Sequence, residues 1–170
     1  FATLASGTSN PLVRGARPGF SYGLEGTAGI GALGIYAATE KVNFDCQSQA
    51  CATSGKYSVQ GITAGLRLGI PILPLIIGIK PWARAGITVG KISGIARSSA
   101  GQIDVTSKRG PGYELGAGID IPVLQFFSLT PQGRIVRQRF DYDATNGGGS
   151  GKSTVSYYTF ELAFKVRSPI

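Results

Sequence analysis

Gly-Tyr-Glu-Leu-Gly-Ala-Gly-Ile-Asp-Ile-Pro-Val-Leu-Gln-Phe-Phe-Ser-Leu-Thr-Pro-Gln-Gly-Arg-Ile-Val-Arg-Gln, residues 112–138, is the stretch that decides the fold of this chain. Large apolar side chains alternate with glycine, hydroxyl or charged residues on both sides of a short turn at Pro122–Gln125. A period of two is typical of β-strands, because successive side chains point to opposite faces of a sheet. The stretch therefore predicts a β-hairpin with one large apolar face and one small, polar face.

The same alternation recurs along the rest of the chain. Residues 33–44 are ambiguous, because Leu33 and Ile35 compete with Val42 and Phe44 for the apolar face. A β-bulge that switches the phase would reconcile them, and we expect one there. Together with the two strands of the hairpin, six further ranges predict eight strands, the first of them short: 1–7, 20–30, 33–44, 57–70, 77–92 and 153–166.

Short and long connections alternate strictly along the chain. This alternation predicts an up-and-down order, with tight turns at one end and long loops at the other. Each strand is close to the about 9–11 residues that cross a bilayer at a tilt. The sequence therefore predicts an all-β protein, a single eight-stranded antiparallel up-and-down transmembrane β-barrel that occupies residues 1–170 with a short tail at 167–170. The short connections lie near residues 31, 71–76 and 122–126, and the long ones at 10–18, 45–55, 93–111 and 143–152.

The composition is unusual for a soluble domain. Charged residues make up 15% of the chain, against about 25% in typical soluble domains. The net charge is +8, but the basic residues are scattered and no recognition helix is apparent, so we expect no nucleic-acid partner. Lipid phosphates or lipopolysaccharide are the favoured anionic neighbours, and the alternative is that the excess charge has no specific partner. The chain has no methionine, so we expect its numbering to start on a mature or trimmed chain.

Two cysteines, Cys46 and Cys51, lie in the polar segment Asp-Cys-Gln-Ser-Gln-Ala-Cys between two predicted strands. A disulfide that staples this loop is the favoured interpretation, and it implies an oxidising compartment. Two free thiols are the alternative. We expect no metal site, because the chain contains no histidine and two thiolates alone do not complete a zinc site.

The alternating segments resemble those of the small eight-stranded outer-membrane β-barrels of Gram-negative bacteria, of the outer-membrane protein A, X and W type. The phrases Gly-Tyr-Glu-Leu-Gly-Ala-Gly-Ile-Asp-Ile-Pro and Leu-Thr-Pro-Gln-Gly-Arg carry the resemblance locally. It implies a location in the bacterial outer membrane and contact with the lipid bilayer. Such barrels often end on an aromatic residue that the assembly machinery reads. Here Phe164 is followed by six residues, so either Phe164 serves this purpose or the chain anchors a further domain.

Two glycine-rich segments match nucleotide-binding motifs in letters alone. Residues 29–34 fit a dinucleotide fingerprint and residues 146–153 nearly fit a phosphate-binding loop, but each motif needs a helix next. Both are interpreted as glycine-rich turns or loops. Without histidine there is no Ser-His-Asp constellation, and the catalytic histidine of barrel enzymes that act on lipid A has no counterpart. Glu114 and Asp120 lie about 20 Å apart along one strand. We therefore expect no catalytic residues, no cofactor and no enzyme activity.

Ionisable residues of both signs share the small, polar face. Enclosed in a narrow barrel they should pair, since an unpaired buried charge is costly, and an eight-stranded barrel leaves room for little more than side chains. We predict a charge network that fills the lumen, and a gated small-solute pore is the alternative. Lys80 and Lys165 share the face nearer the strand ends. The predicted network consists of Glu25, Arg67, Arg84, Glu114, Asp120, Arg134 and Glu161.

The function predicted from these features is structural or interactive. The long loops at 45–55 and 93–111 are the expected contacts for envelope proteins or lipopolysaccharide, because loops are where such a scaffold varies its function. The chain would then be an integral barrel, and a role as one subunit of a larger envelope assembly is a further hypothesis. A transport or binding barrel for small or hydrophobic ligands is the alternative, and a soluble lipocalin-like barrel is the third hypothesis.

Overall fold

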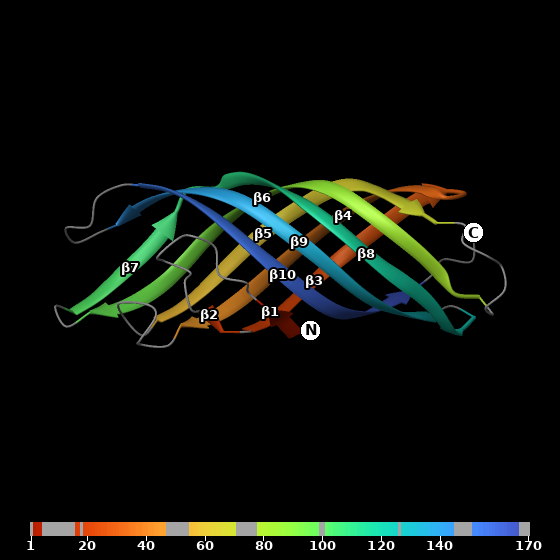
Figure 1. Cartoon of the computed structure of the whole chain (residues 1–170), viewed down its shortest axis with the longest axis horizontal. Helices are drawn as coiled ribbons and strands as arrows, with labels where there is room; N and C mark the ends of the chain where they lie inside the picture. The colour runs from red at the N-terminus through yellow and green to blue at the C-terminus, as the bar shows by residue number, and fades with distance from the viewer. Residues whose placement is uncertain are drawn as a thin grey trace.

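The computed structural model describes residues 2–4, 16–17, 19–46, 55–70, 78–98, 101–125, 127–144 and 151–166. These residues form one curled antiparallel sheet whose strands cross the long axis obliquely (Figure 1). They contain no helix that is long and apolar enough to cross a membrane. The strands are β1 (Ala2–Leu4), β2 (Ala16–Arg17), β3 (Gly19–Ile30), β4 (Leu33–Cys46), β5 (Gly55–Gly69), β6 (Lys80–Ser98), β7 (Gly101–Ser107), β8 (Gly110–Leu124), β9 (Phe127–Ala144) and β10 (Gly151–Val166).

Eight of these strands follow one another in up-and-down order, which confirms the prediction of an all-β, eight-stranded antiparallel up-and-down sheet. Seven of them pair antiparallel in a row: β3 with β4, β4 with β5, β5 with β6, β6 with β8, β8 with β9 and β9 with β10. The eighth strand, β1, pairs with both β10 and β3. The β3–β4 and β8–β9 turns lie at one end, here named the tight-turn end, and the β6–β7 hairpin lies at the other, the loop end (Figure 1). Gly31 makes the first turn with a φ of +64°, a left-handed conformation that glycine adopts without steric cost.

The bulge predicted for residues 33–44 is wrong. β4 pairs residue by residue with both neighbours and shows no register shift. Leu33 and Ile35 point outward, whereas Val42 and Phe44 are buried inside. Odd-numbered and even-numbered residues of β4 are both apolar, because the strand buries its inner face at the loop end and exposes an apolar outer face at the tight-turn end.

The long loop predicted at residues 93–111 is also wrong, because most of it is sheet. β6 runs on to Ser98 and turns into β7, which pairs with it in a hairpin. β7 then contacts the end of β9 through residues 105–107, and β8 begins directly at Gly110. Residues 102–106 therefore lie within β7 rather than in a loop.

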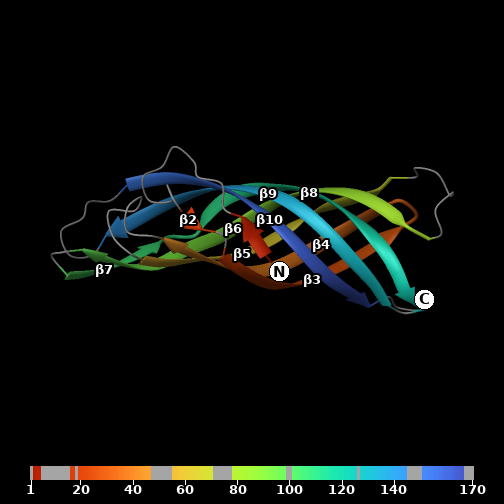
Figure 2. The same cartoon turned by 60° about the horizontal axis from the view of Figure 1, so that its bottom comes forward.

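β1 is a narrow link between the two edges of the curled sheet. It joins β10 at residues 158–160 and β3 at residues 19–20, and Figure 2 shows it against both strands. Within the described ranges, residues 21–30 of β3 and 161–166 of β10 have ladder partners on one side alone. We call this stretch, where no described ladder joins β3 to β10 on the tight-turn side of β1, the seam.

Apolar side chains occupy opposite faces at the two ends of the sheet. At the loop end they point inward and form what we call the inner apolar cluster: Val42, Phe44, Val59, Val136, Phe140, Val155 and Tyr157. Toward the tight-turn end they point outward and form the outer belt: Tyr22, Leu24, Ile30, Leu33, Ile35, Ile62, Leu66, Leu68, Ile87, Val89, Tyr113, Leu115, Ile119, Phe127, Ile135, Tyr158, Phe160, Leu162 and Phe164.

Several predictions fall on residues that the structure does not describe. Four predicted segments lie outside the described ranges: the turn at 71–76, most of the loop at 45–55 with Cys51, the loop residues 145–150 and the tail at 167–170. The backbone of Cys46 ends β4, and the predicted disulfide with Cys51 stays a prediction.

Candidate functional site

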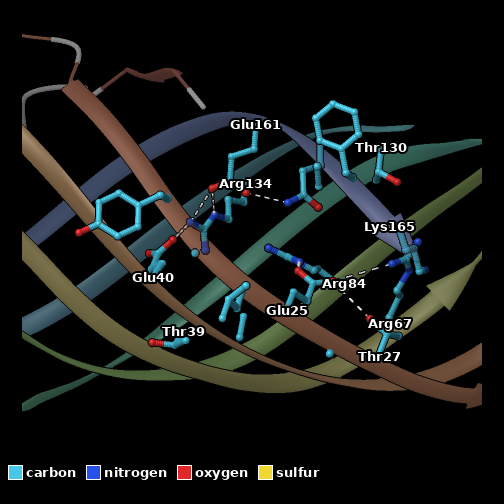
Figure 3. A pocket seen from close by; sticks show the side chains of 18 of the residues that line it. Glu25, Thr27, Thr39, Glu40, Arg67, Arg84, Thr130, Arg134, Glu161 and Lys165 are labelled. Carbon is cyan, nitrogen blue, oxygen red and sulfur yellow. Dashed lines mark hydrogen bonds and ion pairs between the residues drawn. The ribbon is translucent and has the colours of Figure 1, made fainter. Parts of the chain in front are cut away.

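The seven charges predicted to fill the lumen all lie on the inner face of the sheet and are linked by ion pairs. Glu25 comes from β3, Arg67 from β5, Arg84 from β6, Glu114 and Asp120 from β8, Arg134 from β9 and Glu161 from β10. Glu40 of β4 and Lys165 of β10 join them. These nine residues are named the lumen network, and Figure 3 shows most of them converging from strands on opposite sides of the sheet.

Arg134 is the centre of the network at its loop-end side. Its guanidinium binds Glu114 at 2.9 Å and Glu161 at 2.6 Å, and it also pairs with Glu40. Its Nε donates to the Thr159 hydroxyl at 2.8 Å. The Arg134 side chain is 4% exposed and the Glu114 side chain is fully buried. One cation therefore offsets three buried carboxylates from three different strands, and Figure 3 shows Arg134 between Glu40 and Glu161.

Arg84 and Arg67 continue the network toward the tight-turn end. Arg84 Nε lies 2.8 Å from Glu114, and its Nη1 pairs with Glu25. Arg67 Nη2 lies 2.8 Å from Asp120 and its Nη1 lies 3.9 Å from Glu25. An unbroken chain of opposite charges thus runs from Asp120 through Arg67, Glu25 and Arg84 to Glu114.

Aromatic and hydroxyl groups complete the coordination of these charges. The Arg67 guanidinium lies 4.0 Å from the centre of the Trp82 ring, a cation–π contact. Trp82 Nε1 donates to Asp120 at 3.1 Å, and the Tyr36 hydroxyl donates to Glu114 at 3.0 Å. The Tyr157 hydroxyl donates to Glu40 at 2.9 Å. Each buried carboxylate therefore has a neutral donor as well as a cation.

Glycines make the room that these long side chains occupy. A Cβ at Gly86 would lie 2.3 Å from the Tyr36 hydroxyl, and one at Gly118 would lie 2.5 Å from the Trp82 ring. A Cβ at Gly116 would lie 3.1 Å from Arg84 Nε. The alternation of glycine with charged residues along the inner face is therefore a packing requirement, because a narrow barrel cannot hold a full side chain at every inward position.

Sequence reasoning missed Glu40, Tyr36 and Tyr157, whereas Lys80 lies opposite Asp120 at the end of a strand, as expected. Glu40 was missed because the facing of residues 33–44 was ambiguous. The available signal was the spacing: Glu40 is an even number of residues from Tyr36 and Val42, so all three lie on the same face of β4. Lys165 pairs with Asp120 at 3.3 Å. Lys80 is exposed at the start of β6, and it does not join the lumen network.

A cavity of about 450 Å³ adjoins the network. Its walls include Glu25, Arg67, Arg134 and Lys165, together with consecutive residues of the two seam strands, 22–27 of β3 and 163–166 of β10. Consecutive residues face both sides of a strand, so the cavity lies along the described edges of β3 and β10 as well as beside the lumen. The interior is therefore less completely filled than the sequence predicts.

The described residues offer little to a cofactor or metal. They contain no group of three or more metal-ligating side chains that could hold an ion. The glycines of residues 29–34 form the β3–β4 hairpin turn, and an antiparallel strand follows it. The near-match to a phosphate-binding loop leads into β10. Each segment is thus followed by a strand rather than by the helix whose N-terminus would hold a phosphate.

No protein-family model matches this chain, and no curated protein matches it. The resemblance to small outer-membrane barrels therefore stays a prediction, and the functional argument has to come from the fold and the lumen network.

Proposed function

We propose that this chain is an integral barrel of the bacterial outer membrane, with a structural or interaction role carried by its loop end. The tight-turn half would lie in the bilayer, with the outer belt against lipid. The lumen network would close the interior to solute flow. The loop end, including the β6–β7 hairpin, would stand outside the bilayer and contact other envelope components.

One observation carries this proposal: the apolar face of the sheet changes sides along its length. At the loop end, Phe44 and Phe140 are 3% and 1% exposed on the inner face. At the tight-turn end, Leu66 and Phe160 are 57% and 59% exposed on the outer face, while charged residues lie inside. A soluble lipocalin-like barrel would keep its apolar face inside throughout. A wall with water outside one half and lipid outside the other accounts for the reversal.

The basic residues of the outer face fit the same division. Lys41, Lys91 and Arg137 each stand on the loop-end side of the belt residues in their own strand. Lysine and arginine are favoured at the edge of a membrane, where their heads reach lipid phosphates. The boundary between belt and basic residues would therefore mark the surface of the bilayer.

Membrane insertion is tested by refolding the chain into detergent and into lipid vesicles. We expect a compact form that migrates faster on a gel until it is boiled, and that protease cuts at the loop end alone once it is in vesicles. A monomer that stays soluble and folded without detergent would contradict the proposal. Planar-bilayer recordings test the filled lumen, and frequent discrete openings would refute it.

A transport or binding barrel is the second candidate, and the seam favours it. The cavity beside Glu25 and Lys165 opens between β3 and β10, so a small amphipathic ligand could enter from the side. If the seam is open, every second amide in residues 161–166 should exchange its hydrogen as fast as an unpaired amide. Uniform protection of these amides would mean that the seam is closed and would remove the lateral route.

A further inference from the structure

We propose that a groove on the outer face of β3–β6 binds a phosphorylated lipid, with its phosphate at Lys41, Lys91 and Arg109 and an acyl chain along the outer belt. The groove has a volume of about 890 Å³, within the about 300–1,000 Å³ of ordinary ligand pockets. Its basic and apolar lining residues face outward, whereas the charges of the lumen network face inward, and Glu40 lines the groove as well as belonging to the network. This inference rests on the proposed membrane location and names a ligand for it.

The basic end of the groove is built by cross-strand pairing. Lys41 of β4 pairs with Gln60 of β5, and Gln60 pairs with Lys91 of β6. Neighbouring strands lie about 4.8 Å apart, so the two lysines stand about 10 Å apart on one face with an amide between them. Arg109 directly precedes β8, whose Gly110 pairs with Gly90 beside Lys91. Three cations thus stand side by side around one end of the groove.

These cations have no counter-charge within the described part of the chain. The ion pairs formed there join the carboxylates of the lumen network to Arg67, Arg84, Arg134 and Lys165, on the inner face. Glu40 also lines the groove, but its carboxylate turns inward to Arg134 and the Tyr157 hydroxyl. An anionic ligand is therefore the complementary one.

The other end of the groove is apolar and selects a lipid over a free phosphate. Leu24, Ile62, Ile87 and Val89 line it and are exposed on the outer face. They follow the basic residues toward the tight-turn end, so a ligand that is phosphate at one end and hydrocarbon at the other fits the order of the lining. A free phosphate would leave these side chains uncovered.

The test compares two triple variants in neutral detergent micelles. The first is Lys41→Gln/Lys91→Gln/Arg109→Gln. The matched control removes the same charge from three exposed basic residues that do not line the groove: Lys80→Gln/Arg139→Gln/Lys152→Gln. The probes are a short-chain phosphatidic acid, a phosphatidylcholine of the same chain length and inorganic phosphate, and binding is followed by native mass spectrometry and by titration.

We expect saturable binding of phosphatidic acid that the first triple weakens about tenfold or more and that the control leaves nearly unchanged. Phosphatidylcholine and inorganic phosphate should bind much more weakly. Equal losses in both triples would mean diffuse charge attraction and would overturn the proposal, as would inorganic phosphate binding as tightly as the lipid, or no saturable binding at all. Heat-modifiable migration of each variant is measured in parallel: a chain that inserts but lacks the site refutes this inference alone, whereas a chain that does not insert refutes the proposed function.

Discussion

Replacing Arg134 with methionine should destabilise the folded barrel more than any other single change to its charges. The substitution keeps much of the side-chain volume but leaves Glu40, Glu114 and Glu161 facing one another in the lumen. In the part of the chain that the structure describes, Glu40 and Glu161 pair with no other cation, and Glu114 keeps Arg84 alone. These carboxylates are 0–9% exposed, so water offers them little relief.

The expected cost follows from this burial. Removing one partner from a buried ion pair typically costs about 3–5 kcal/mol, because the remaining charge stays desolvated. With a urea slope of about 1–3 kcal/mol per molar, the unfolding midpoint should fall by about 2 M. Trp82 is the sole tryptophan of the chain, and it is buried against Arg67, so its fluorescence in detergent or vesicles reports unfolding directly.

Two further variants separate the network from the loss of a positive charge as such. Arg137→Met removes a charge three residues along the same strand, on the exposed face, and should change stability by less than about 0.5 kcal/mol. Adding Glu161→Gln to Arg134→Met should restore part of the loss, since it removes one of the stranded carboxylates. If Arg134→Met costs no more than Arg137→Met, or if the second substitution deepens the loss, the network does not stabilise the fold in the way described.

Three other predictions address the belt, the glycines and the cysteines. Leu115→Arg should lower the stability of the chain in lipid vesicles by about 2–4 kcal/mol if this position lies near the bilayer midplane, and an unchanged urea midpoint would place it elsewhere. Gly86→Ala should displace the Tyr36 hydroxyl and destabilise the barrel, whereas Gly26→Ala, where an added Cβ meets nothing within 4 Å, should be nearly neutral in the same titration. Mass spectrometry after alkylation of the oxidised protein should find Cys46 and Cys51 unlabelled until they are reduced, and labelling without reduction would mean free thiols.

Local alternation was enough to predict most of the fold and most of the lumen network. Glu114, Arg134 and Glu161 were placed inside because, in their strands, only every second residue is large and apolar. Such a strand has one apolar face and one polar face, so the direction of each side chain follows from the sequence. Glu40 escaped because β4 is apolar on both parities, outward at one end and inward at the other. Facing along such a strand depends on which solvent surrounds each half, which local periodicity does not encode.

The hairpin and the seam lay beyond sequence reasoning for different reasons. Residues 93–111 are rich in serine and glycine and show no alternation. They nevertheless form the end of β6 and all of β7, because the edge of β9 offers β7 partners at residues 142–144. The seam depends on which described residues of β3 and β10 have ladder partners on both sides. Both are long-range properties of the sheet, so no single segment carries a signal for them.

The lumen network ties together strands that no backbone ladder joins. Arg84 of β6 reaches Glu25 of β3, and Arg134 of β9 reaches Glu40 of β4. A shift of any of these strands by one residue would turn its charge outward, into the outer belt. A buried ion pair adds little net stability compared with a well-packed apolar pair, but removing one partner is costly. The network therefore acts mainly to specify strand order and register, because the correct assembly is the one in which every enclosed charge finds its partner.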